Sequence, residues 1–155
     1  MANGVKFNIQ IRGLAKLSTK FSQAPIKTYY ELDKAVKRAA LVAVDAIKDE
    51  TPIGKTRGGT LKRGIRAEFG DLTATISPHN APYAIFVHEG TSPHIIRPKN
   101  KKALFWKGAK HPVRLVRHPG TRANPFFENG LESARTDIED IFAKSVEDIL
   151  KFIAS

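Results

Sequence analysis

The sequence predicts an α+β fold in which a mostly antiparallel β-sheet packs against two long α-helices. Two segments, near residues 25–50 and 125–153, place apolar side chains at helical spacing. Between them lie short segments of β-branched and apolar residues, bounded by glycine, asparagine and proline. At 155 residues the chain is long enough for one domain with its own core, so we expect a single domain over residues 1–155.

The N-terminal third predicts a strand, a short helical turn and a long helix. Residues 4–12 alternate between apolar and polar side chains, as a half-buried strand does. A helical turn is expected around residues 14–21, and Pro25 marks the first turn of the long helix. Thr51-Pro52 ends that helix because the residue before a proline disfavours helical geometry. Its expected apolar face, whose alanines would allow close packing on a sheet, comprises Tyr29, Leu32, Val36, Ala39, Ala40, Ala43, Ala46 and Ile47.

The middle of the chain predicts two basic loops and several short strands. Three glycines and three basic residues in residues 52–62 favour a mobile loop, extending to residue 63, that orders on binding a partner. Gly70-Asp71 separates two apolar segments, which predicts a hairpin with strands at 65–69 and 72–76. Residues 83–88 predict a helical turn that Gly90 ends. Further strands are expected at 94–97, 104–106 and 113–116, with a second mobile basic loop at 97–102.

The last helix is expected over residues 125–153, because apolar side chains form a stripe with acidic residues opposite. The expected stripe comprises Phe127, Leu131, Ala134, Ile138, Ile141, Phe142, Val146, Ile149 and Ile153.

Charge is divided unevenly along the chain. The net charge is +11, and residues 51–122 alone carry 14 basic and 3 acidic side chains, whereas residues 123–155 carry 3 basic and 7 acidic. Such a positive segment attracts polyanions or the acidic surface of a partner, although a solvated basic face that aids solubility fits equally well. The candidates for contact with a partner or DNA are Lys55, Arg57, Lys62, Arg63, Arg97, Lys99, Lys101 and Lys102.

The sequence argues against an enzyme, because no nucleophile, base and acid are spaced for catalysis. Glu89 ends an apolar turn, where it could be partly buried beside an arginine, but we favour a role in locking the neighbouring backbone. His88-Glu89 lacks the second histidine of a zinc-protease helix, so we expect no metal site and no cofactor. The glycines and Lys55 in residues 54–59 lack the Gly-Lys-Ser/Thr ending of a phosphate-binding loop.

Composition also bears on location. The chain has no cysteine, and no apolar run approaches the ~20 residues that cross a bilayer. Residues 1–4 lack the basic start and apolar segment of a signal peptide, so we expect synthesis in the cytoplasm and no membrane contact.

The order of these features resembles the tail-completion (neck, or head–tail joining) proteins of long-tailed bacteriophages. The resemblance runs through almost the whole chain, although the family often has a serine where this chain has Gly64. It is carried, after an N-terminal strand and an alanine-rich helix, by Thr51-Pro52, Gly59-Thr60-Leu61-Lys62, Tyr83-Ala84 with Glu89-Gly90-Thr91, a basic strand pair, and Pro125-Phe126 before the final helix.

The resemblance implies a structural virion protein, made in the cytoplasm of a bacterial host. Such subunits form a ring of six at the head–tail junction, around the channel through which DNA leaves, and contact other neck and tail proteins. A tail-terminator or head-closure subunit is an alternative of the same class. A basic nucleic-acid-binding protein acting alone is the alternative of another class, and a small hydrolase is the least favoured.

Overall fold

The computed structural model describes residues 14–54 and 58–155, with side chains from residue 19 onward. Its elements, in chain order, are α1 (Leu14–Glu50), α2 (Thr60–Gly64), β1 (Ile65–Gly70), β2 (Thr73–Pro78), α3 (Ala84–His88), β3 (His94–Ile96), β4 (Val116–His118) and α4 (Phe126–Ala154). The α+β class is confirmed. The strands form two separate antiparallel ribbons, β1–β2 and β3–β4, and the strand expected at residues 4–12 lies outside the described residues.

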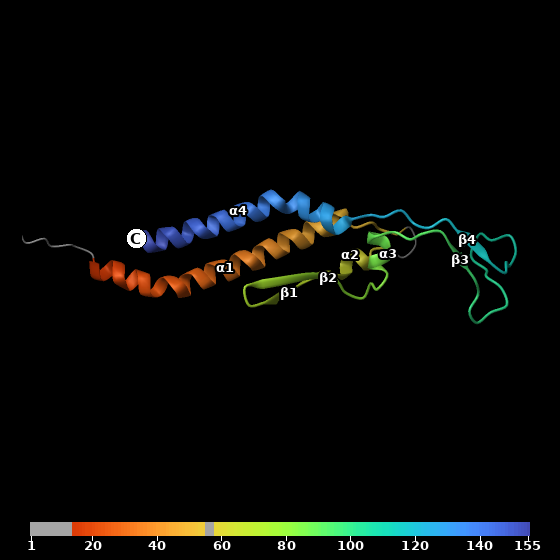
Figure 1. Ribbon diagram of the computed structural model, residues 1–155, viewed down its shortest axis with the longest axis horizontal. Helices are drawn as coiled ribbons and strands as arrows, with labels where there is room; N and C mark the ends of the chain where they lie inside the picture. Colours follow the sequence, from red (N-terminus) through yellow and green to blue (C-terminus); the bar gives the residue numbers. More distant parts are fainter. Residues whose placement is uncertain (1–13, 55–57) are drawn as a thin grey trace, which may run out of the picture.

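Figure 1 shows an elongated molecule built around α1 and α4, which lie antiparallel over most of their length. Small residues of α1 form the contact face, with Ala35, Ala39 and Ala43 buried. In the C-terminal part of α4, the Ser145 hydroxyl donates to the backbone carbonyl of Glu31 on α1 at 3.0 Å. The two helices therefore form the body of the molecule.

The long helix begins at Leu14 rather than at residue 25, and Pro25 lies inside it. A proline inside a helix removes one hydrogen bond, which is why the sequence indicated a helix start there. The structure supplies contacts that compensate: the Lys20 ammonium lies 4.2 Å from the centre of the Phe152 ring on α4. Packing against α4 thus extends the helix past a local signal for its start. The expected stop at Thr51-Pro52 is confirmed, and the Thr51 hydroxyl donates to the Ile47 carbonyl at 2.6 Å.

Most of the expected apolar stripe of α4 is covered, with Ala134 buried and Phe127, Ile138, Ile141, Phe142, Ile149 and Ile153 half-buried. Leu131 and Val146 are 45% and 49% exposed, whereas Gly130 and Ser145 are buried. Helices that pack closely use small residues at the contact, so hydrophobicity alone did not identify Gly130 and Ser145. A Cβ on Gly130 would lie 2.5 Å from the Cα of Ile47 on α1.

Replacing Gly130 with alanine should therefore destabilise the helical pair. Overpacking against backbone costs about 1–3 kcal/mol, and the site offers no flexible side chain that could move aside. Alanine's better helix propensity, worth about 1 kcal/mol, offsets only part of that cost. Urea denaturation would measure the loss, with Asn129→Ala on the exposed side of the same turn as the control. An unchanged free energy of unfolding in Gly130→Ala would contradict this close crossing.

The expected hairpin is confirmed, with Ile65 opposite Pro78 and Gly70 opposite Thr73. Leu72 lies in the two-residue turn at φ 49° instead of starting the second strand. The Tyr29 hydroxyl on α1 donates to an Asp71 carboxylate oxygen at 2.5 Å and so fastens the hairpin tip to the body. This hydrogen bond, followed by the Asp71 charge, raises the pKa of Tyr29.

The hydrophobic core lies where the helical pair meets the hairpin and the two short helices. Residues 60–63, expected within a loop, belong to α2 (Thr60–Gly64), which contributes the buried Leu61. The expected turn at residues 83–88 is confirmed as α3, which contributes Ala84. Phe126 and Ile47 are fully buried at the centre of this cluster. The segment of residues 91–121 leaves this core after α3 and returns to it before α4.

Candidate interaction surface

Residues 91–121 form an arm that extends beyond the core end of the helical pair (Figure 1). In β3 and β4, His94 lies opposite His118 and Ile96 opposite Val116. The strand expected at 104–106 is reduced to a single bridge between Leu104 and Val113, and the strand expected at 113–116 is displaced to residues 116–118. The arm is therefore a thin ribbon with a long loop, and much of its side-chain surface is open.

Two glycine-containing motifs form the root of the arm. Thr91 of Glu89-Gly90-Thr91 pairs with Thr121 of Pro119-Gly120-Thr121 through backbone hydrogen bonds of 2.9 and 3.0 Å. Gly90 and Gly120 have φ angles of 75° and 90°, which favour glycine. A Cβ on Gly120 would lie 2.2 Å from the Thr91 carbonyl oxygen. These motifs hold the two chain segments together where the arm leaves the body.

Replacing Gly120 with alanine should open this root. The substitution combines backbone strain of about 1–3 kcal/mol with a clash against the opposite backbone. We expect the amides of Thr91 and Thr121 to exchange hydrogen faster than in the unmodified protein. Gly108→Ala is the matched control, because Gly108 also has a positive φ of 103° but no atom within 4 Å of an added Cβ. Equal protection of the root amides in the two variants would contradict the proposed clash.

The arm is uniformly basic. Residues 90–127 contain no aspartate or glutamate. No ion pair within the described part of the chain involves an arm residue. The eight cations, all exposed, are Arg97, Lys99, Lys101, Lys102, Lys107, Lys110, Arg114 and Arg117. Their mutual repulsion is relieved only by solvent ions or by a partner of opposite charge.

Exposed apolar side chains accompany these charges. Trp106 and Phe105 are 51% and 68% exposed, so neither side chain belongs to the hydrophobic core. A hollow of about 280 Å³ on the arm is lined by Ile96, Leu104, Phe105, Trp106 and Val116. Large aromatic and apolar side chains beside cations are typical of a protein–protein contact surface.

The residues predicted to contact a partner or DNA do not form one surface in the structure. Arg97, Lys99, Lys101 and Lys102 lie together on the arm, whereas Lys55 and Arg57 lie outside the described residues. Lys62 and Arg63 lie on α2, and the Lys62 ammonium is 3.2 Å from an Asp49 carboxylate oxygen. Sequence reasoning missed the arm cations Lys107, Lys110, Arg114 and Arg117. The absence of acidic residues between Glu89 and Glu128 is the signal that could have identified them.

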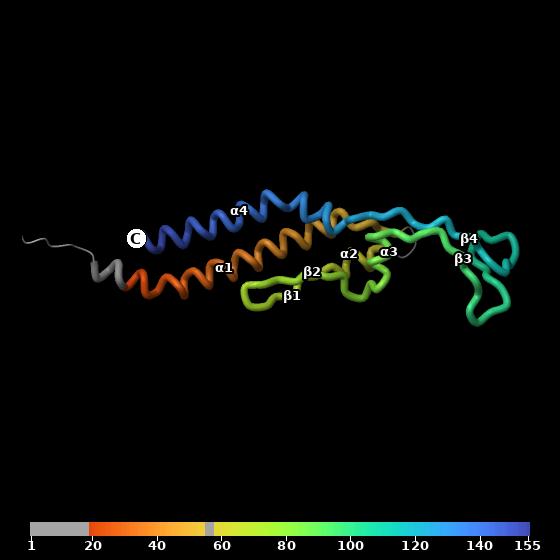
Figure 2. The backbone as a smooth tube through the Cα atoms, viewed as in Figure 1, coloured from red at the N-terminus to blue at the C-terminus, as the bar shows by residue number. Residues whose placement is uncertain are grey.

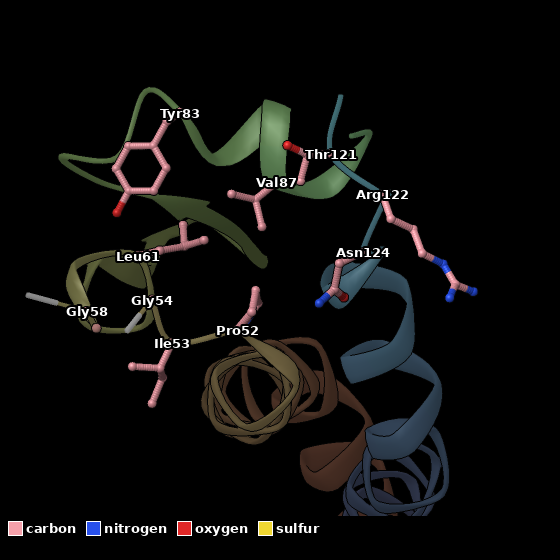
Figure 3. Close-up of a pocket in the computed structure, with 11 residues that line it drawn as sticks. Pro52, Ile53, Gly54, Gly58, Leu61, Tyr83, Val87, Thr121, Arg122 and Asn124 are labelled. Carbon is pink, nitrogen blue, oxygen red and sulfur yellow. The ribbon is translucent and has the colours of Figure 1, made fainter. Parts of the chain in front are cut away.

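A pocket of about 430 Å³ lies beside the arm root (Figure 3). Tyr83, Leu61 and Val87 surround one side, and the Arg122 side chain points away from the others. None of its described lining residues is an aspartate, a glutamate or a histidine. The lining, which suits an apolar group better than acid–base chemistry, comprises Pro52, Ile53, Gly54, Gly58, Gly59, Leu61, Tyr83, Val87, Thr121, Arg122 and Asn124.

Two acidic residues lie close to the same core, Glu89 of the Glu89-Gly90-Thr91 motif and Glu128 in the first turn of α4. Glu89 is exposed and none of the described ion pairs includes it, so the alternative of a buried, arginine-paired Glu89 is wrong. Its backbone N–H instead donates to the Ile85 carbonyl at 2.9 Å and closes α3. On α4, a Glu128 carboxylate oxygen lies 2.5 Å from the His88 imidazole. A hydrogen bond from its own backbone N–H, followed by the one from His88, lowers the pKa of Glu128.

Because folding lowers the pKa of Glu128, the free energy of unfolding depends on pH. The stabilisation is present above the ordinary pKa of 4.5 and is lost as pH falls through the lower folded-state pKa. Glu128→Gln should therefore be less stable than the unmodified protein at about pH 7 and equally stable at about pH 2. Urea denaturation at both pH values checks this, with Glu132→Gln on the same helix as the control. A constant difference between Glu128→Gln and the unmodified protein across this range would contradict the assignment.

None of the helices in the described residues is long and apolar enough to cross a membrane. Within residues 14–54 and 58–155, no three histidine, aspartate or glutamate side chains are grouped as ligands of a metal ion. Comparisons of the chain with protein-family models, with curated proteins and with solved structures gave no match.

Proposed function

We propose that this protein is a structural subunit of a long-tailed bacteriophage virion that joins the head to the tail. It acts as a tail-completion, or neck, subunit in a ring around the DNA channel, and it catalyses no reaction. Synthesis takes place in the cytoplasm of the bacterial host, and the assembled subunit resides in the virion. The observation that carries the proposal is the arm, an exposed basic and apolar surface extended from a two-helix body, whose cations form no ion pair with a described residue (Figure 1).

The apolar part of the arm favours a protein partner. Phosphate contacts need cations but not exposed isoleucine, leucine and phenylalanine, whereas a protein interface uses both. Ile95 is 53% exposed and Leu115 is 45% exposed beside the arm cations. The ordered motifs that resemble neck proteins also acquire a physical role, because Glu89-Gly90-Thr91 forms half of the arm root and Phe126 anchors α4 in the core.

A stand-alone nucleic-acid-binding protein is the second candidate, because the arm is entirely basic. That function predicts tight DNA binding by the isolated chain, with an affinity that falls steeply as salt rises. The joining function predicts weak DNA binding and specific association with heads, tails or neighbouring neck proteins. A salt titration of binding to duplex DNA separates the two candidates.

The joining function is tested by complementation in vitro. A lysate from a phage or prophage in which the gene for this chain has been deleted is mixed with the purified protein. We expect infectious particles to form only after the protein is added. Failure of the protein to restore infectivity, in a lysate that contains intact heads and tails, would contradict the proposal.

A further inference from the structure

The outward side of α4 carries an acidic groove. It has a volume of about 510 Å³ and includes Leu131, which is 45% exposed. Arg135 lies 3.8 Å from a Glu132 oxygen and 3.1 Å from a Glu139 oxygen, so one cation serves two carboxylates. The groove residues are Glu128, Leu131, Glu132, Arg135, Ile138 and Glu139.

The arm has the complementary properties. Its cations are exposed and unpaired within the described residues, and its apolar hollow of about 280 Å³ lies among them. The groove on α4 offers an exposed leucine flanked by excess acids, and the arm offers an apolar hollow flanked by excess cations. The two surfaces therefore match in charge and in apolar character.

The arm does not reach this groove in its own chain. β3 and β4 pack on each other beyond the core end of the helical pair, and α4 runs in the opposite direction from that end (Figure 2). A second copy of the chain can present its α4 to the arm. Contact between two different surfaces of identical chains is heterologous, and such contacts repeat into rings or filaments.

We propose that the arm of one copy docks on the α4 groove of a second copy. The exposed leucine of the groove packs against the hollow lined by Phe105 and Trp106, while Lys99, Lys101 and Lys102 face the acids of α4. The place of the resulting ring at a head–tail junction rests on the proposed function, whereas the contact itself involves only this chain.

The absence of cysteine from the chain allows a direct test by cross-linking. Lys101→Cys marks the arm and Glu132→Cys, at a side chain 76% exposed, marks the groove. The two full-length variants are mixed at low salt and treated with a short bis-maleimide. Asp45→Cys on α1, at a side chain 81% exposed, replaces the groove variant in the control mixture.

We expect a cross-linked dimer from the arm and groove variants mixed together. It should be absent when either variant is treated alone and when Asp45→Cys replaces the groove variant. A dimer from the arm variant alone would show arm-to-arm contact and overturn the proposal. No dimer at any concentration at which the protein is soluble would also overturn it, and tight capture of the arm by duplex DNA in that case would assign the arm to nucleic acid.

Charge reversal provides a second, independent readout. Changing Lys99 and Lys102 to glutamate beside the arm cysteine at position 101 should abolish the cross-link. Changing Glu132 and Glu139 to lysine should also abolish it, with the groove cysteine moved to Arg135. The arm-reversed and groove-reversed variants mixed together should cross-link again, because the charge complementarity between the two surfaces is restored. Absence of the cross-link from this mixture would contradict a charge-directed contact.

The outcome is separable from that of the proposed function. If deletion of the gene leaves heads and tails unjoined but the two variants give no dimer, the joining role stands and this contact does not. If the dimer forms but deletion leaves infectious particles, the contact stands and the joining role does not.

Discussion

Replacing Phe126 with alanine should lower the free energy of unfolding by about 3–5 kcal/mol. The Phe126 side chain is fully buried. Its ring lies 5.5 Å from the His88 ring and 5.0 Å from the Phe127 ring, measured between centres. Deleting it leaves a cavity in the core that the ring fills together with Ile47, Leu61 and Ile65.

The measurement is urea denaturation followed by circular dichroism, with Phe105→Ala as the matched control. Phe105 is 68% exposed on the arm, so its removal should change the free energy of unfolding by less than about 0.5 kcal/mol. A loss of similar size in both variants, or a loss below about 1 kcal/mol in Phe126→Ala, would contradict the position of the core.

Reversing the charge of Lys99, Lys101 and Lys102 to glutamate should abolish head–tail joining while leaving the fold intact. All three side chains are exposed and none forms an ion pair with a described residue. The reversal places three carboxylates on the surface that we propose meets an acidic partner, so attraction becomes repulsion. Complementation of the deletion lysate should fall to the level seen without added protein, and the denaturation midpoint should stay unchanged.

The matched control carries the same change in net charge on α1, at Lys34, Lys37 and Lys48. These lysines pair with acids on their own helix, so their reversal should cost only a few tenths of a kcal/mol per pair and leave complementation intact. Equal loss of complementation in both variants would show that net charge, and not the arm, decides assembly. Full activity of the arm variant would contradict the account of the arm.

Much of the fold is local in origin and could be predicted from the sequence. The stop at Thr51-Pro52, the hairpin turn that follows Gly70 and the helix after Pro125 each depend on the conformational preferences of a few residues. The start of α1 could not be predicted, because Pro25 indicated a boundary and the contacts of the first turns with α4 join residues far apart in the sequence. Gly130 was missing from the expected buried face of α4, because the close crossing uses a residue that carries no hydrophobic signal.

The candidate surface could be predicted only where its residues are neighbours in the sequence. Sequence reasoning identified the cations at 97–102, since they are adjacent in the chain. The remaining arm cations and the exposed Trp106 become one surface only because Thr91 pairs with Thr121 and brings the ends of the arm together. That pairing joins residues thirty positions apart, and no local pattern specifies it.

The central claim, that this protein joins heads to tails, is tested most directly by electron microscopy of a lysate from a phage or prophage in which its gene has been deleted. We expect DNA-filled heads and separate tails of uniform length. Emptied heads would instead indicate head closure, and tails of irregular length a tail terminator. Intact infectious particles would contradict the joining role and favour a basic nucleic-acid-binding protein.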